Sequence, residues 1–224
     1  MTPLLAEDLL LLLLDDEKGT ARSSYTAAAL GGALLAELAL SGAAEIEEKT
    51  SFWRAPHVHV LTAEPLLDPE LQRGMAVIAE KERSATALVQ RLGSGLESRL
   101  AGRLAERGIL EKREDRILGL FPRTTWPARD TRHEEELQAA LAGALVTGTE
   151  PDDRTAVLIG LLSATGRLEP AFDRHGVPRS DIRRRAKEIS RGDRATEAVR
   201  AVVAATTAAI VAAAGAGAAG AASS

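Results

Sequence analysis

Apolar residues recur with a helical period along most of this chain. A leucine-rich segment covers residues 3–14 and closes at Lys18-Gly19, and a second segment covers about residues 24–40 and ends before Gly42. The second segment is apolar on nearly every side, which is typical of a helix enclosed by others rather than one lying on a surface. We therefore expect two helices here, of which the second is central and buried.

Further helices are expected where capping residues precede periodic segments. The expected elements are residues 69–83 after Asp68-Pro69, 84–92, 95–107, 131–146 with Thr131 and Glu134 as a capping box, a helix to residue 165 opened by Thr149, Pro151 and Asp152, a basic helix 180–189 capped by Ser180, and a last helix from Asp193 to about Val211. The sequence therefore predicts a mainly α fold.

Four short segments alternate polar and apolar residues, as strands do. Residues 44–49 and 52–62 predict one strand pair. After Gly108, which suits a helix end, residues 109–113 and 116–121 flank Glu114-Asp115 and predict a β-hairpin that turns at this acidic pair. We expect one helical domain over residues 1–211, with a hairpin and an additional strand pair, followed by a flexible Ala/Gly-rich tail over 212–224.

Composition narrows the class of protein. Of 224 residues, 45% are hydrophobic and 27% charged, so the chain can bury a core and remain soluble, and the absence of cysteine excludes disulfides, thiolate nucleophiles and cysteine zinc sites. Acidic Glu7 and Asp8 precede the leucine run, which argues against a signal peptide. The uncharged segment 201–224 is mostly alanine and glycine, so we do not expect a transmembrane helix.

Positive charge is concentrated in two stretches although the net charge is −4. Residues 91–132 hold ten bases and six acids, and residues 179–200 hold eight bases and four acids. These stretches form either one anion-attracting face or two solvated faces that never meet. Arg99, Arg103 and Arg107 share one face of a helix that precedes the hairpin, an order also seen in winged-helix nucleic-acid binders.

No motif of an enzyme or cofactor protein is convincing. The sequence has no nucleophile elbow, P-loop or metalloprotease helix. The GAGAAG run at 215–220 follows no strand, and His57 and His59 share a strand face but lack a third ligand at a persuasive spacing. We expect no catalysis, no metal and no cofactor.

Several blocks in order carry a family resemblance. They are LLAEDLLLLLLDDEKG near residues 4–19, LGGALLAELALSG at 30–42, RLAGRLAERGIL at 99–110, RTTWP at 123–127, DDRTAVLIGLLSATGRLEPAF at 152–172 and AVRAVVAA at 198–205. The chain resembles the Golgi phosphoprotein 3 family over roughly residues 3–211. The resemblance implies one mostly helical domain with a projecting β-hairpin.

The resemblance also implies a peripheral membrane protein that reads phosphatidylinositol 4-phosphate and binds cytosolic tails of membrane proteins. The four positions of the family's headgroup pocket fall here on Arg22, Gly31, Ser94 and Glu97, and none carries the family's residue. Arg99 matches a basic family position. The candidate headgroup residues are therefore Arg22, Arg99 and Arg103.

The family hairpin takes part in membrane contact and self-association, so the candidate residues for these roles are Leu118, Leu120 and Phe121. Their alternative role is to cover the core. Abundant alanine, leucine and arginine without cysteine suggest a high-GC bacterial source, in which the membrane is the inner face of the plasma membrane.

The sequence thus predicts a non-catalytic, cytoplasmic adaptor at the membrane surface that binds anionic phospholipid or a phosphoinositide. The first alternative is a protein-binding adaptor or homo-oligomeric scaffold without lipid affinity. The second alternative is winged-helix-like nucleic-acid binding, which the acidic remainder of the chain disfavours.

Overall fold

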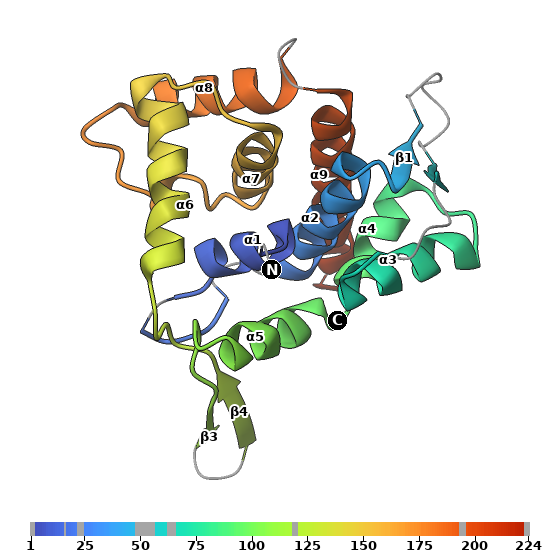
Figure 1. The fold of residues 1–224 in the computed structure, drawn as a ribbon, viewed down its shortest axis with the longest axis horizontal. Helices are drawn as coiled ribbons and strands as arrows, with labels where there is room; N and C mark the ends of the chain where they lie inside the picture. The colour runs from blue at the N-terminus through green and yellow to red at the C-terminus, as the bar shows by residue number, and fades with distance from the viewer. Residues whose placement is uncertain are drawn as a thin grey trace.

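The computed structural model describes residues 3–15, 17–21, 25–47, 57–61, 66–117, 121–192 and 196–221. Helices packed around one another form the body, and a two-stranded hairpin extends from it (Figure 1). The mainly α fold predicted from the sequence is confirmed.

The elements follow the expected order with shifted ends. The helices are α1 Leu5–Leu13, α2 Thr26–Leu40, α3 Pro69–Glu80, α4 Ala85–Gly93, α5 Leu96–Glu106, α6 Arg132–Ala142, α7 Asp153–Ala164, α8 Arg179–Arg191 and α9 Glu197–Ala221. The strands are β1 Ala44–Ile46, β2 Val58–Val60, β3 Arg113–Ile117 and β4 Phe121–Thr125. A π-helical turn, Gly143–Thr147, extends α6, and a 3₁₀ turn, Glu169–Ala171, precedes α8. Strands β1 and β2 pair antiparallel, as do β3 and β4.

Helix α2 is the centre of the body, as its all-round apolar sequence predicts. It contacts α1, α3, α4, α5, α7 and α9. Small residues allow the closest of these approaches: a Cβ atom added at Gly31 would collide with the carbonyl oxygen of Val89, and one added at Gly93 would collide with that of Ala27. Helices α2 and α4 therefore cross with their backbones nearly touching, a distance that only glycine permits.

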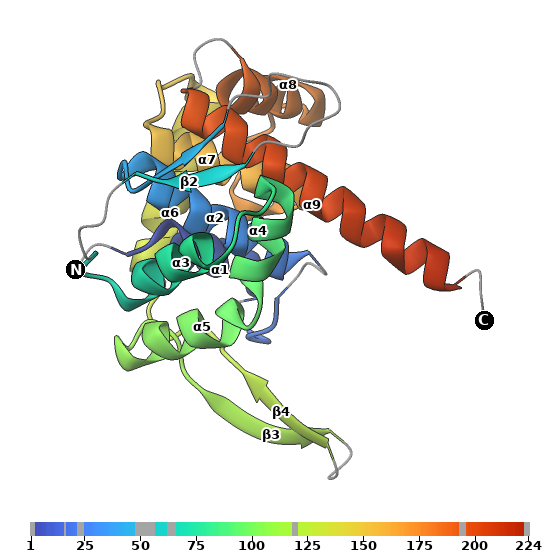
Figure 2. The same ribbon diagram turned by 90° about the vertical axis from the view of Figure 1, so that its right-hand side faces the viewer.

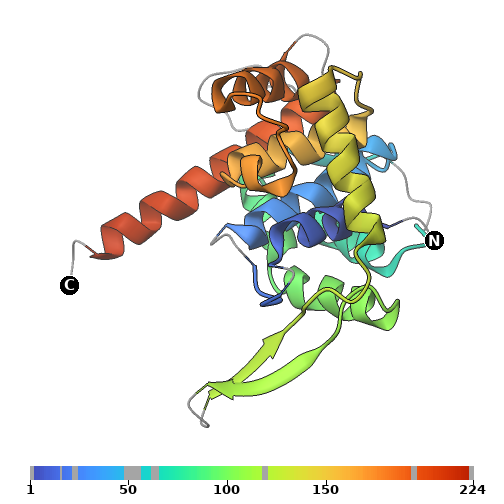
Figure 3. The same cartoon turned by 90° about the vertical axis from the view of Figure 1, so that its left-hand side faces the viewer.

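Helix α9 closes the other side of α2 and then leaves the body. Gly160 of α7 faces Val203 of α9, again where a Cβ would collide, and Val199, Val202 and Val203 are buried. The helix continues beyond Val211 to Ala221, and its last part stands clear of the other helices (Figures 2 and 3). Within the described residues, no helix is long and apolar enough to cross a membrane.

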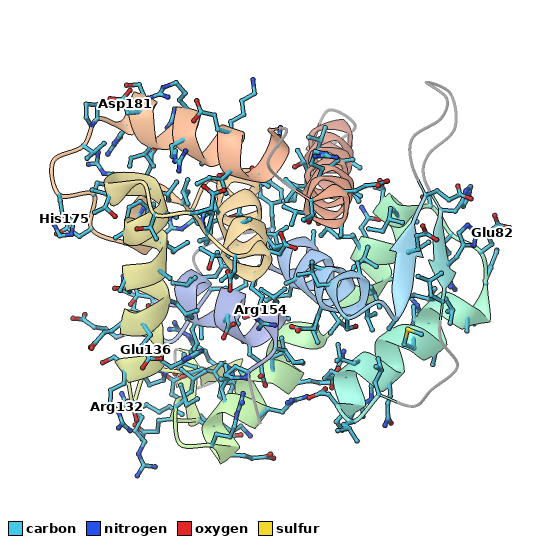
Figure 4. All side chains as sticks on the ribbon, turned by 45° about the horizontal axis from the view of Figure 1, so that its top comes forward. Glu82, Arg132, Glu136, Arg154, His175 and Asp181 are labelled. Atoms are coloured by element: carbon cyan, nitrogen blue, oxygen red, sulfur yellow. The ribbon has the colours of Figure 1, made fainter. Side chains whose placement is uncertain are left out.

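Helix α1 carries two buried acids among its leucines. Glu7 is 0% exposed and Asp8 is 5% exposed. Arg154 of α7 lies between α1 and α2 (Figure 4), where it donates to Asp8 Oδ2 at 3.1 Å and to Glu37 Oε1 at 2.5 Å. His133 Nε2 lies 2.7 Å from the other oxygen of Asp8. Burying charge requires partners, and these contacts tie α1, α2, α6 and α7 together.

Several expected caps are wrong although their helices form. Thr131 makes no capping bond and instead donates to Glu135, while the Asp130 side chain accepts from the amide of Arg132. Helix α7 is capped by Asp152, which accepts from Thr155, and not by Thr149.

Helix α8 starts one residue before Ser180, directly after Pro178, with no side-chain cap. Asp193, the expected start of the last helix, lies outside the described residues. A capping residue satisfies whichever amide its local turn presents, so a sequence pattern alone misplaces caps by a residue or two.

Candidate functional site

The hairpin β3–β4 projects from the lower end of the body in Figure 1 and packs extensively against no other described element. The turn expected at Glu114-Asp115 is wrong: both residues lie within β3, opposite Thr124 and Arg123. The last pair is Ile117 with Phe121, so the chain reverses between them, and Gly119 is the sequence signal that marks the reversal.

The distal part of the hairpin is apolar in sequence. Leu118 and Leu120 lie outside the described residues, and Phe121 is known here by its backbone, as the first residue of β4. The roles of these residues in membrane contact or self-association therefore remain predictions. What the structure adds is that Ile117 and the backbone of Phe121, which flank these positions, form the last described pair of the projecting hairpin.

Arg99, Arg103 and Arg107 share one side of α5 as expected, but all three are paired with acids. Arg99 Nε donates to both carboxylate oxygens of Glu70, at 3.1 and 3.0 Å. Arg107 Nη2 lies 2.6 Å from Glu7 Oε1. The face that sequence alone presents as open for phosphate is turned toward α1 and α3.

Arg103 has the most extensive set of contacts of the three. It forms a two-point hydrogen bond with Asp68, at 2.9 and 2.6 Å, and its Nε lies 3.0 Å from Glu7 Oε1. Glu7 Oε1 accepts no well-aligned hydrogen bond from either arginine, so that attraction is chiefly Coulombic. The hydrogen bonds with Asp68 are the main cause of a raised pKa of Arg103. Arg103 is thus held as a structural cation, and Arg22 lies outside the described residues.

An open cleft of about 800 Å³ lies where α5 meets the base of the hairpin. One wall is the loop of Gly19 and Ala21, another is α5 with Glu97 and Glu106, and the third comprises Lys112 and Trp126. The loop is attached to the hairpin base because the Trp126 amide donates to the Gly19 carbonyl at 2.8 Å, and a Cβ on Gly19, at φ 58°, would collide with the Trp126 backbone.

Glu97 distinguishes this cleft from an ordinary surface hollow. Burial raises the pKa of its carboxyl group. Lys112 Nζ lies 2.5 Å from Glu114 Oε1, and both side chains are more than half exposed. In the sequence, Glu97 stands out only as a position where a family arginine is lost, because a glutamate in the first turn of a helix gives no local sign that it lines a cleft.

The other family headgroup positions do not converge on the cleft as cations. Gly31 lies at the α2–α4 crossing, where no side chain fits against the backbone of Val89 and Gly93. Ser94 ends α4, and its carbonyl accepts from Arg99 Nη1 at 3.3 Å.

The second basic stretch lies at the opposite end of the molecule. Helix α8 is at the top of Figure 1 and the hairpin is at the bottom, and the turned views in Figures 2 and 3 agree. Arg179 and Arg183 of α8 both face Glu169, at 3.4 and 2.6 Å. The two basic stretches therefore do not form a single face.

The histidine pair on the small sheet shares one carboxylate. His59 Nε2 lies 2.8 Å from Glu47 Oε1, and His57 Nδ1 lies 3.5 Å from Glu47 Oε2. Among the described residues, no group of three or more histidine or acidic side chains is placed to hold a metal ion.

Comparison with known proteins agrees with the fold. The family model for Golgi phosphoprotein 3 (GPP34) matches residues 5–206, from the first leucine of α1 into α9. No curated protein matches the chain significantly. A match of this extent covers the body, the hairpin and the cleft together, and the chain belongs to the Golgi phosphoprotein 3 family.

Proposed function

We propose that this protein is a non-catalytic adaptor that docks reversibly on an anionic membrane through its hairpin end. The Golgi phosphoprotein 3 family is one of Golgi-associated, non-enzymatic adaptors. Because the composition points to a bacterial source, the membrane we propose is the inner face of the plasma membrane. Cytosolic tails of membrane proteins are the partners that the family suggests.

The projecting hairpin is the observation that carries this proposal. Its strands make few contacts with the body, and the segment from Ile117 to Phe121 at its end is apolar apart from one glycine. Burying a large apolar side chain in the acyl boundary contributes about 1.5–3 kcal/mol. Two or three such residues therefore suffice for reversible docking.

Charge supplies a weaker contribution at the same end. Lys112, Arg113 and Arg123 lie on the hairpin, and each cation near an anionic leaflet contributes about 1 kcal/mol. Acids on β3 offset part of this attraction. The proposal therefore specifies an anionic surface and does not depend on a stereospecific phosphoinositide pocket.

Liposome co-sedimentation tests the proposal. We would compare vesicles of neutral phosphatidylcholine, vesicles with phosphatidylglycerol and vesicles with phosphatidylinositol 4-phosphate, each at low and high salt. A variant with Leu118→Ser, Leu120→Ser and Phe121→Ser is expected to bind anionic vesicles at least tenfold more weakly. Arg184→Gln on α8, at the opposite end, is the matched control and is expected to bind normally.

The outcomes separate the alternatives. Binding that requires phosphatidylinositol 4-phosphate and is lost in Arg22→Ala or Arg99→Ala supports the headgroup residues predicted from sequence. Absence of binding to every vesicle contradicts membrane docking and favours the protein-binding adaptor or oligomeric scaffold. A salt-sensitive gel shift with DNA is the corresponding test for nucleic-acid binding.

A further inference from the structure

The cleft at the base of the hairpin has the wrong charge for a phosphate site. Among the described residues that line it, Glu97 and Glu106 are acidic and Lys112 is the one base. The ammonium group of Lys112 is already 2.5 Å from Glu114 at the rim. A phosphomonoester that carries two negative charges and no cationic group would be repelled by this lining.

Glu97 is the group in the cleft that most needs a ligand. Its side chain makes no hydrogen bond or ion pair with another described residue, whereas the arginines two and six positions further along α5 are both paired. Burial without a cation raises its pKa, so the ionised carboxylate is destabilised in the folded protein. Its place in the first turn of α5 offers some compensation through the helix dipole. The helix dipole would act on Glu97 whether or not its side chain lined a cleft, so the dipole does not explain why Glu97 lies there.

The remaining lining suits a cation with hydrogen-bond donors. Trp126 is partly buried against the core and also lines the cleft, and aromatic faces attract cations. Thr20, Ser98 and Thr124 add hydroxyl groups that accept hydrogen bonds. A primary ammonium has three N–H donors for such acceptors, whereas a quaternary ammonium has none.

We propose that this cleft binds the headgroup of an ethanolamine phospholipid, with its ammonium group at Glu97 and Trp126 and its phosphate toward Lys112. The pair between Lys112 and Glu114 is exposed and weak, so Lys112 is free to exchange partners. A cleft of about 800 Å³ has ample room for this headgroup. The assignment of this headgroup to a membrane lipid rests on the membrane docking proposed above. The preference of the cleft for an ammonium group does not.

Fluorescence titration with soluble ligands tests the ammonium preference without a membrane. The chain has two tryptophans, and Trp53→Phe leaves Trp126 as the single reporter inside the cleft. Phosphoethanolamine is expected to give a saturable change in emission, and glycerol phosphate and inorganic phosphate are expected to give none. Phosphocholine is expected to bind at least fivefold more weakly than phosphoethanolamine.

Two further variants test whether Glu97 is responsible for the binding of phosphoethanolamine. Glu97→Gln keeps the size of the side chain and is expected to weaken phosphoethanolamine binding at least tenfold. Glu45→Gln removes an exposed acid from β1, remote from the cleft, and is expected to change nothing. Circular dichroism confirms that each variant is folded. Unchanged binding in Glu97→Gln, or equal binding of glycerol phosphate, overturns the proposal.

Vesicles separate this proposal from membrane docking. Adding phosphatidylethanolamine to anionic vesicles is expected to raise binding of the wild type more than that of Glu97→Gln. The serine variant of the hairpin is expected to lose vesicle binding while its titration with phosphoethanolamine stays normal. If phosphoethanolamine gives no saturable change in emission while the wild type still binds vesicles, the cleft proposal is wrong and membrane docking stands. If phosphoethanolamine binds but the wild type does not bind vesicles, membrane docking alone is disproved.

Discussion

Arg103 of α5 donates from Nη1 to Asp68 Oδ1 at 2.9 Å and from Nη2 to Asp68 Oδ2 at 2.6 Å. The same carboxylate caps α3, because it also accepts from the amide of Glu70 at 2.8 Å. One acidic side chain therefore both starts a helix and joins it to another helix 35 residues later in the chain. A two-point, charge-assisted pair of this kind is specific as well as strong.

Breaking this pair is expected to destabilise the protein. Arg103→Ala leaves the Asp68 carboxylate, which is 8% exposed, without its main cation, so we expect a loss of about 2–3 kcal/mol in the free energy of unfolding. Urea denaturation measures the loss. Asp130 and Arg132 form a comparable but exposed pair, so Arg132→Ala is expected to cost far less stability than Arg103→Ala. Equal losses in the two variants would falsify the structural role of Arg103.

Acid is expected to weaken the same contact. Burial of Asp68 alone would raise the pKa of its carboxyl group, but Arg103 and the backbone amides of Glu70 and Leu71 outweigh burial and lower it below 3.8. A lowered pKa stabilises the folded state above the pKa of the unfolded chain, and this contribution is lost as the pH falls through the folded value. The stability difference between wild type and Asp68→Asn should therefore shrink as urea midpoints are measured from pH 5 down to pH 2. A difference independent of pH contradicts this assignment.

The α2–α4 crossing is expected to be intolerant of any side chain. Gly31→Ala places a Cβ against the carbonyl oxygen of Val89, and the backbones must separate, at a cost of about 1–3 kcal/mol. Gly102→Ala on α5 is the matched control, because a Cβ there meets nothing within 4 Å. That change is expected to stabilise the helix by about 0.5–1 kcal/mol. Thermal unfolding of both variants gives the sign of each effect.

Glu97 is expected to lower the stability of the free protein at neutral pH. Its pKa is raised by burial, so the folded state holds the proton more tightly than the unfolded state, and stability declines as the pH rises through that interval. Glu97→Gln removes this cost, and we expect it to raise stability at pH 7. The gain should be smaller at pH 3, where the carboxyl group is protonated in both states. A loss of stability at pH 7 argues against an uncompensated carboxylate.

The end of the hairpin is expected to contribute almost nothing to folding. Replacing Leu118, Leu120 and Phe121 by serine should change the free energy of unfolding by less than about 0.5 kcal/mol, because β3 and β4 make few contacts with the body. Denaturation of this variant beside wild type measures the change. A large loss of stability would show that these residues belong to the core, which was the alternative role considered from sequence.

Much of the helical architecture was predictable because its causes are local. The period of apolar residues located α2 and the capping role of Asp68 located the start of α3, and both rest on residues within a few positions of one another. The existence of the hairpin was predictable, but the position of its turn was not. The acidic pair Glu114-Asp115 lies within β3, and the glycine at 119 is the better sequence signal for the turn.

The site was predictable only in outline. Sequence placed Arg99, Arg103 and Arg107 on one helical face, because that spacing is a property of the helix itself. It could not show that Glu7, Asp68 and Glu70, which lie far away in the chain, pair with them. The buried acids of α1 were the available signal, because a charge in a leucine-rich helix requires a partner.

The sequence by itself determined that this chain is a mainly helical member of its family with a hairpin and no motif for catalysis. Only the tertiary structure decided which charged side chains are paired within the fold and which remain available to bind a ligand. It paired the arginines of α5, separated α8 from the hairpin, and left Glu97 facing a cleft. The physical reason is that helix formation depends on near neighbours along the chain, whereas the environment of a charge depends on the groups that packing brings around it.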